Sequence, residues 1–189
     1  MEKLFFKKIF FNLMEVLNLS SSFLFSNPEK QIAKILTNNN LTLATAESCT
    51  GGLISSRLTD ISGSSSYIKE NFITYVNEAK NKYLEVSLTD IEKYGVVSKE
   101  IAIQMAQGLL KISNCDIAIS TTGIAGPTGE TSNKPVGLVY IAIADKNNVI
   151  SLKFNANHLF YRRIMKYKFS QAALEFLLNF LKENYKGDN

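Results

Sequence analysis

A serine at position 48 stands where a short apolar run meets a helical pattern. Residues 41–46 have the composition of a buried strand, and residues 45–52, Thr-Ala-Glu-Ser-Cys-Thr-Gly-Gly, lead into apolar positions spaced as on a helix. A strand that turns sharply into a helix places the helix's first N–H groups and the positive end of its dipole at the turn. Ser48 can therefore either cap the helix or act as a nucleophile whose oxyanion those N–H groups hold. The local sequence alone favours the cap.

A lysine that could act as the base for such a serine lies further along the chain. In residues 75–80, Tyr-Val-Asn-Glu-Ala-Lys, Tyr75 falls at the end of an expected strand, and Lys80 falls in the first turn of a helix capped by Asn77. The positive end of a helix dipole lowers the pKa of a lysine, and a neutral amine is a competent general base for a hydroxyl. The alternative is a solvated surface lysine, the common state of this residue. Lys82, two residues on, points elsewhere on the helix.

A glycine-rich segment that follows another apolar run could bind an anion. Residues 121–129, Thr-Thr-Gly-Ile-Ala-Gly-Pro-Thr-Gly, come after an expected strand at 116–120 and are interpreted as a loop. Successive small residues let backbone N–H groups converge on a phosphate, although an ordinary connection explains the segment equally well. No Gly-Lys-Ser/Thr follows, so the segment is not a Walker A loop. Cys49 has no histidine near it in sequence and is interpreted as a packing residue.

The elements that position these residues alternate between strand and helix patterns. Strands are expected at 41–46, 72–75 and 116–120, and helices at 29–37, 53–59, 78 onward, 89–94 and from a Ser98 cap to about 112. Apolar runs at 136–144 and 149–154, joined by Asp-Lys-Asn-Asn, indicate a hairpin, and a long helix is expected from about 159 to 185. The order predicts an α/β fold, a three-layer α/β/α sandwich on a mixed, mostly parallel sheet.

Residues 1–26 stand apart from this domain. Their apolar residues have helix-like spacing and follow lysines at positions 3, 7 and 8. A signal peptide fits less well, because Glu15 interrupts the apolar run and no small-residue cleavage site follows cleanly. We interpret 1–26 as an N-terminal amphipathic extension that packs on the domain or on a partner, with a start codon assigned too early as the alternative. The domain proper is expected at 27–189.

The composition excludes several classes of protein. With 46% hydrophobic and 20% charged residues, the 189-residue chain is ordinary globular material. The net charge of +4, without a dense Lys/Arg stripe, argues against a nucleic-acid partner. One histidine and two cysteines provide neither a zinc site nor a disulfide framework, and no apolar run is long enough to span a membrane. We therefore expect a cytoplasmic protein without metal or cofactor.

Taken together, the three stretches resemble the CinA C-terminal domain family, the nicotinamide mononucleotide deamidases. Further matching pieces are Ser-Gly-Ser-Ser from position 62, Gly-Val-Val-Ser from 95 and Lys-Pro-Val-Gly from 134, in family order over about 29–181. The resemblance implies hydrolysis of the carboxamide of nicotinamide mononucleotide to nicotinate mononucleotide and ammonia, without a metal. By that likeness Ser48 is the nucleophile, Lys80 is its base, and Tyr75 assists proton movement.

We expect three groups of substrate-binding residues, of which the resemblance itself implies the loop from Thr122 to Gly126; Glu47 could orient the site or only favour the helix start. They are Glu47, Thr50 and Gly51 at the serine turn; Thr121, Thr122, Gly123, Ala125 and Gly126 in the glycine-rich segment; and His158 and Arg162 before or within the last helix. The small-molecule partner is then nicotinamide mononucleotide, and a homo-oligomer is expected.

One departure from the family leaves an alternative open. The family usually carries an arginine in a Gly-Asp-Arg element, whereas residues 156–158 are Ala-Asn-His. If that arginine contacts phosphate, His158 is a weaker and pH-dependent substitute. The alternative function is therefore a degenerate member that binds a nucleotide or a protein without turnover. A DNA-associated competence factor is a third interpretation, which the missing basic stripe disfavours.

Overall fold

The computed structural model describes residues 27–156 and 161–185, and in them a five-stranded sheet lies between two layers of helices. The strands are β1 (Leu43–Glu47), β2 (Ile68–Ile73), β3 (Ile117–Gly123), β4 (Leu138–Asp145) and β5 (Val149–Asn155). Their spatial order is β2-β1-β3-β4-β5, with β1 parallel to both neighbours and β4 antiparallel to both of its own. The expected three-layer sandwich on a mixed sheet is confirmed, and β4 alone among these strands runs against the others.

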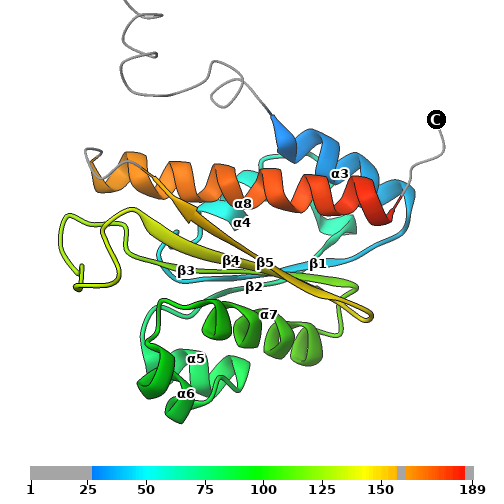
Figure 1. Ribbon diagram of the computed structural model, residues 1–189. Coiled ribbons are helices and arrows are strands. Elements are labelled where there is room, and N and C mark those ends of the chain that lie inside the picture. The colour runs from blue at the N-terminus through cyan, green and yellow to red at the C-terminus, as the bar shows by residue number, and fades with distance from the viewer. Residues whose placement is uncertain (1–26, 157–160, 186–189) are drawn as a thin grey trace, which may run out of the picture.

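Six described helices cover the two faces of the sheet (Figure 1). One layer holds α3 (Pro28–Asn38), α4 (Leu53–Thr59) and α8 (Arg162–Asn184). The other holds α5 (Asn77–Leu84), α6 (Leu88–Tyr94) and α7 (Lys99–Ser113). A 3₁₀ turn, Ser64–Ser66, precedes β2. The helix pair α4 and α5 thus flanks the sheet from opposite sides, and each begins just after the carboxyl end of a neighbouring strand.

The two faces of the central strands carry different side chains, because successive residues of a strand point to opposite sides. Leu43, Ile117 and Ile119 belong to the large core under α3, α4 and α8. Ala44 and Ala118, on the opposite face, pack against α7. Small side chains on this second face let α7 lie close to the sheet, and both faces of β1 and β3 are buried as expected for central parallel strands.

A buried arginine connects α3, α4 and α8, the helices of one layer. Arg57 of α4 pairs with Glu29 of α3 at 2.5 Å and donates to Ser170 and Gln171 of α8 at 2.9 and 2.5 Å. Its guanidinium also lies 4.9 Å from the centre of the Tyr167 ring. An arginine buried with all these partners is costly to disrupt, so α4 is held firmly in place behind the turn that precedes it.

The element boundaries differ from the expectation at several places. β3 continues through Gly123, so residues 121–123 are strand rather than loop; they pair with Ile141, Tyr140 and Val139 of β4. β2 starts four residues earlier than expected, at Ile68. Asn77 does not cap α5 but is its first residue, and Val76 is the N-cap, without a side-chain capping bond. The Ser98 cap of α7 is confirmed, with Oγ accepting from the Ile101 N–H at 3.3 Å.

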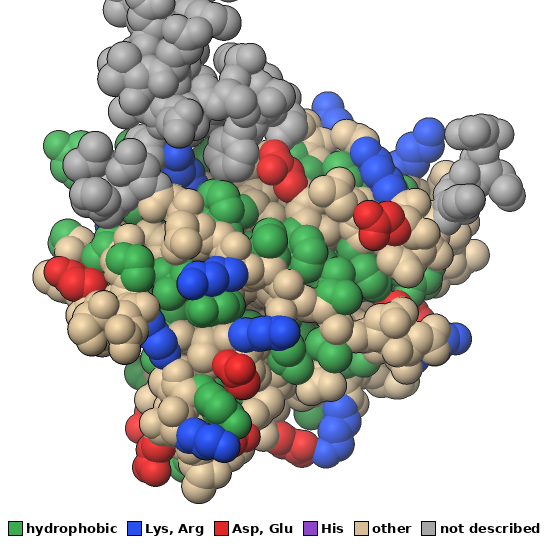
Figure 2. Space-filling view, viewed as in Figure 1, with side chains coloured by type: hydrophobic (Ala, Val, Ile, Leu, Met, Phe, Trp, Pro, Cys, Tyr) green, Lys and Arg blue, Asp and Glu red, His purple; other side chains and the backbone are tan. Residues whose placement is uncertain are grey.

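On the surface shown in Figure 2, Lys and Arg side chains are dispersed among acidic and apolar ones rather than gathered into a stripe. Within the described residues, no helix combines the length and apolarity that crossing a membrane requires. The expected amphipathic extension at 1–26 and His158 lie outside the described residues.

Candidate active site

Ser48 lies directly after β1, at the carboxyl ends of the parallel strands. Its N–H donates to the Thr121 carbonyl at 3.2 Å, which continues the β1–β3 ladder, and the chain then turns through Gly51 and Gly52 with φ of 61° and 89°. Those positive φ values suit glycine, so the two glycines allow the chain to enter α4 within a few residues. The Ser48 side chain is not the helix cap, since Gly52 is the N-cap and has no side-chain capping bond. The interpretation of Ser48 as a cap is therefore wrong.

Glu47 satisfies the start of α4 instead. Its carboxylate accepts from the N–H groups of Gly52, Ile54 and Ser55 at 3.0, 3.1 and 2.8 Å, and from the Ser55 hydroxyl at 2.6 Å. The side chain is fully buried, and it is not among the residues that line the cavity beside Ser48. The expectation that these α4 N–H groups hold an oxyanion is therefore not met, because a carboxylate already occupies them. Glu47 fixes the serine turn rather than facing a ligand in that cavity.

Lys80 is the side chain that meets the serine. Its Nζ lies 3.2 Å from Ser48 Oγ, and it donates to the carbonyl oxygens of Thr74 at 2.7 Å and Tyr75 at 3.1 Å. In its neutral form the amine has two N–H donors and one lone pair, so it could donate to both carbonyls and use the lone pair to accept the serine proton. The sequence pattern placed Lys80 near the start of α5, and the fold turns its side chain back toward the residues before that helix.

Burial lowers the pKa of Lys80 from 10.5 to about 8. The side chain is completely inaccessible to solvent, and desolvation disfavours the ammonium form. The direction matches the expectation, but the main cause is burial rather than the helix dipole. Lys82, set aside on sequence grounds, is exposed and lies over the Tyr83 ring.

A cavity of about 270 Å³ opens beside the Ser48–Lys80 pair. Among the described residues that line it, the charged ones are Lys80 and Arg162, and none is Asp or Glu. Val96, Val97 and Ile124 give it an apolar wall. A small cleft with an apolar wall, two basic groups and a paired hydroxyl is suited to an anionic or phosphorylated molecule with a flat apolar part.

Arg162 closes one side of this cavity by linking two other segments. It donates to the Gly126 carbonyl at 2.5 Å and to the Tyr75 hydroxyl at 2.7 Å, which joins α8 to the loop after β3 and to the segment before α5. Tyr75 also lines the cavity and is 57% exposed. Both side chains are therefore within reach of a molecule that enters the cavity.

The remaining expected binding residues divide into lining and supporting positions. Thr122, Gly123 and Ala125 line the cavity, and Thr122 Oγ1 donates to the Val96 carbonyl at 2.8 Å. Thr50 and Thr121 are buried and hydrogen-bond to each other at 3.0 Å. Gly51 is exposed, and a Cβ built on it would lie 3.0 Å from Lys166 Nζ. Thr50, Thr121 and Gly51 thus shape the turn, and their contact with a ligand stays a prediction.

Sequence reasoning did not assign a binding role to the lining residues Cys49, Asn77, Val96 and Val97, whereas Ile124, Thr128 and Gly129 belong to the segment expected to bind an anion. Gly-Val-Val-Ser at 95–98 was a matching piece of the resemblance, which was the available signal for Val96 and Val97. Cys49, the neighbour of the serine, is buried, and burial raises the pKa of its thiol to about 12. Such a thiol is a poor nucleophile, which agrees with its interpretation as a packing residue.

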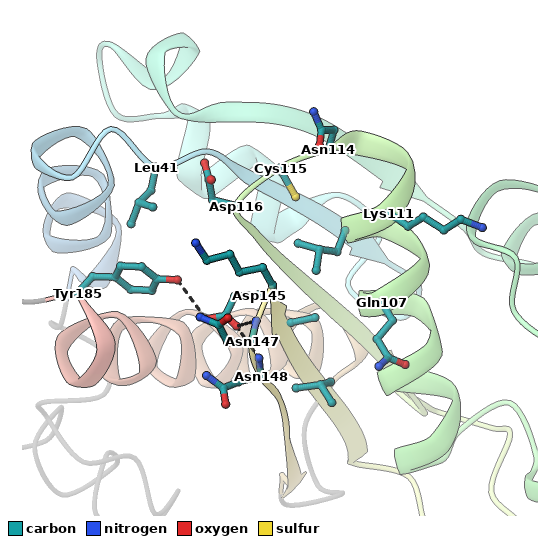
Figure 3. Close-up of a pocket in the computed structure, with 14 residues that line it drawn as sticks. Leu41, Gln107, Lys111, Asn114, Cys115, Asp116, Asp145, Asn147, Asn148 and Tyr185 are labelled. Carbon is teal, nitrogen blue, oxygen red and sulfur yellow. Dashed lines mark hydrogen bonds between the residues drawn. The ribbon is translucent and has the colours of Figure 1, made fainter.

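A larger cavity, of about 840 Å³, lies at the opposite end of the sheet (Figure 3). Asp145 accepts from the N–H groups of Asn147 and Asn148 at 2.8 and 2.6 Å and from the Tyr185 hydroxyl at 3.0 Å. These hydrogen bonds hold the β4–β5 turn against the end of α8. The Asp145 carboxylate is therefore already used to stabilise the fold. Among the described residues, no group of three His, Cys, Asp or Glu side chains could hold a metal ion. The Ser48–Lys80 cavity is therefore the candidate active site.

Known proteins share this architecture and sequence. Residues 26–181 match the CinA C-terminal domain family. A CinA-like protein of Chlorobium phaeobacteroides is 46% identical over 149 residues, which is 77% of this chain and 35% of that protein. A CinA-like protein of Chloroherpeton thalassium is 48% identical over 155 residues, 81% of this chain and 37% of that protein. The chain thus spans about a third of the length of these curated relatives.

Solved structures give the same result. The competence/damage inducible protein CihA from Agrobacterium tumefaciens superposes with a TM-score of 0.76 at 39% identity, covering 82% of this chain and 96% of that one. The competence damage-inducible protein A (ComA) from Klebsiella pneumoniae superposes with a TM-score of 0.79 at 26% identity, covering 83% and 96%. Fold and sequence comparisons therefore agree on the family.

Proposed function

The chain belongs to the CinA C-terminal domain family, and from that premise and the site geometry we propose that it is an amidohydrolase with a Ser48 nucleophile and a Lys80 base. Its proposed substrate is nicotinamide mononucleotide, whose carboxamide is hydrolysed to the acid and ammonia. The observation that carries the proposal is the buried Lys80 amine, 3.2 Å from Ser48 Oγ and with a pKa lowered to about 8. A serine hydroxyl paired with a neutral buried amine is the activated nucleophile that acyl transfer requires.

The chemistry follows from the pair. Lys80 takes the proton of Ser48 Oγ as the oxygen attacks the carboxamide carbon, and a tetrahedral oxyanion forms. Lys80 then passes the proton to the leaving nitrogen, the C–N bond breaks, and ammonia departs from an ester on Ser48. Water attacks that ester with Lys80 as base, and the returned proton restores the serine. The Lys80 amine acts as base both when the Ser48 ester forms and when it is hydrolysed. Ser48 and Lys80 together therefore account for all the proton transfers.

Binding of the nucleotide is proposed to use the basic and apolar sides of the cavity. Val96, Val97 and Ile124 provide a wall for the pyridinium ring, and Arg162 provides a guanidinium for the phosphate. The Thr122, Gly123 and Ala125 segment lies along the same cavity. Tyr75, held by Arg162 at 2.7 Å, is placed to assist proton movement near the leaving group.

Ammonia release from nicotinamide mononucleotide tests the proposal. The full chain is assayed with a chelator present, beside Ser48→Ala and the matched control Ser56→Ala, an exposed serine of α4. Turnover by the wild type and the control, lost in Ser48→Ala, is expected. A folded wild type that binds the nucleotide without releasing ammonia would instead support a binding module, the alternative that the His158 departure left open.

We also propose that the protein forms a homo-oligomer and is located in the cytoplasm. Sedimentation of the full chain and fractionation of cells that express it measure the two directly.

A further inference from the structure

The tetrahedral intermediate of the proposed reaction needs hydrogen-bond donors, and four N–H groups of the serine turn are already engaged. The N–H groups of Gly52, Ile54 and Ser55 donate to the Glu47 carboxylate, and the Ser48 N–H donates to the Thr121 carbonyl. An anionic oxygen placed there would also meet the negative charge of Glu47. Donors from another segment around Ser48 would avoid both the engaged N–H groups and this charge.

The start of α5 has the opposite character. Its N-cap, Val76, provides no side-chain capping bond, and its first turn carries Glu78 as its acidic residue. Asn77 lines the candidate cavity together with Tyr75 and Lys80, so the positive end of this helix adjoins the cavity. The uncapped end thus lies beside the reacting groups, whereas the capped end of α4 lies behind them.

The side chain of Asn77 is available as a donor in that place. Asn77 is half-buried, and its carboxamide has no hydrogen-bond partner among the residues that the structure describes. It precedes Lys80 by three positions on α5, which puts the two side chains on one face of the helix. The Lys80 side chain extends back to the carbonyls of Thr74 and Tyr75, so Nζ, and with it Ser48 Oγ at 3.2 Å, lies near the first turn that Asn77 begins.

We propose that Asn77 is a catalytic residue whose side-chain N–H donates to the oxyanion that forms when Ser48 Oγ attacks its substrate. The use of a carboxamide substrate in this assignment rests on the proposed function, but the presence of Asn77 in the cavity that Ser48 lines does not. An amide is suited to the role because it donates without titrating, whereas a carboxylate at the same position would repel the developing negative charge.

Two readouts separate this proposal from the substrate assignment. The first is kcat and KM for nicotinamide mononucleotide. The second is the rate at which a fluorophosphonate reagent labels Ser48, followed by intact mass. In labelling, the Ser48 Oγ–P bond forms, the P–F bond breaks, fluoride leaves, and Lys80 takes the serine proton. The phosphoryl oxygen then occupies the oxyanion position whatever the natural substrate is.

The variants are Asn77→Ala, Asn77→Asp and the control Asn81→Ala. Asn81 is an exposed asparagine on the same helix whose Nδ2 donates to the Val86 carbonyl at 2.9 Å. Loss of one side-chain oxyanion donor is expected to lower kcat and the labelling rate by about 10²–10³-fold, with KM little changed. Asn77→Asp is expected to be at least as slow as Asn77→Ala, and Asn81→Ala should stay within about twofold of wild type, because it changes α5 without removing the donor.

Unchanged labelling in folded Asn77→Ala would overturn the proposal, as would equal losses in Asn77→Ala and Asn81→Ala, which would indicate a structural effect on α5. Labelling that slows in Asn77→Ala while the wild type releases no ammonia would support Asn77 and reject the nucleotide substrate. A wild type that is neither active nor labelled would overturn both assignments, since Ser48 would not be a nucleophile.

Discussion

Replacing Lys80 by methionine should change how the stability of the protein depends on pH. Lys80 is fully buried in the folded protein, and burial lowers its pKa to about 8, whereas its ordinary value is 10.5. Between these two values the unfolded chain carries a proton on this amine that the folded chain does not. The free energy of unfolding of the wild type must therefore rise with pH across that window. A methionine of similar length has no proton to lose and removes this dependence.

The two pKa values differ by about 2.5, which corresponds to about 3 kcal/mol over the whole window. From about pH 7 to about pH 9.5 the wild type should gain about 2 kcal/mol relative to Lys80→Met. The comparison cancels other groups that titrate in both proteins. The sign of the difference at one pH is less informative, because methionine also leaves the Thr74 and Tyr75 carbonyls without the amine.

Urea unfolding measured at several pH values for wild type, Lys80→Met and Lys82→Met provides the test. Lys82 is exposed, so its replacement should leave the pH dependence of the wild type intact. If the difference between wild type and Lys80→Met stays constant from about pH 7 to about pH 9.5, then Lys80 has an ordinary pKa in the folded chain. The proposed neutral base would then lose its physical support.

Three further outcomes are expected. The value of kcat/KM for the proposed substrate should increase with pH through about 8, since the neutral Lys80 amine is the active form; a profile flat from about pH 6 to about pH 9 would contradict this. Glu47→Gln should destabilise the fold by about 2 kcal/mol and slow turnover, because an amide cannot accept all the N–H groups at the start of α4; urea unfolding beside the exposed Glu92→Gln measures the difference. Thr74→Val should stabilise the protein by about 1 kcal/mol, because the buried Thr74 hydroxyl has no hydrogen-bond partner among the described residues. A melting temperature below that of the wild type would show that this hydroxyl does have a partner.

The chemistry of the site could be predicted from sequence because its key residues occur in short segments with clear neighbours. Ser48 follows a buried strand, and Lys80 falls at a helix start, so strand and helix patterns placed both near the carboxyl end of the sheet. The alternation of strand and helix patterns along the chain also predicted the three layers of the sandwich. What joined the two residues was the parallel pairing of β1 with β2, in which Glu47 lies opposite Ile73. Because these two strands end side by side, Ser48, which follows Glu47, lies close to the segment that leads from Ile73 into α5 and Lys80.

The errors have a common cause, which is that tertiary contacts decided what local composition could not. Residues 121–123 have a loop composition, yet they extend β3 because β4 pairs with them across its first half. A Cβ on Gly123 would lie 2.6 Å from the Leu138 carbonyl, so the glycine marks a close approach of strands. The low pKa of Lys80 came mainly from burial, a property of the assembled layers. For Glu47, the sequence allowed both a role at the site and a role at the helix start, and the contacts of its carboxylate with α4 show the second.

The order of the strands also affects how copies of this chain can meet. Within residues 27–156 and 161–185, β2 and β5 each have one unpaired side, and such edges can recruit another strand and lead to aggregation. β2 carries the exposed charges Lys69 and Glu70 at its centre, and β5 carries the exposed Lys153. A strand added at either edge would have to accommodate these charges beside its own side chains, which discourages continuation of the sheet. Any oligomer of this chain is therefore expected to form through helix or loop surfaces rather than by joining sheets.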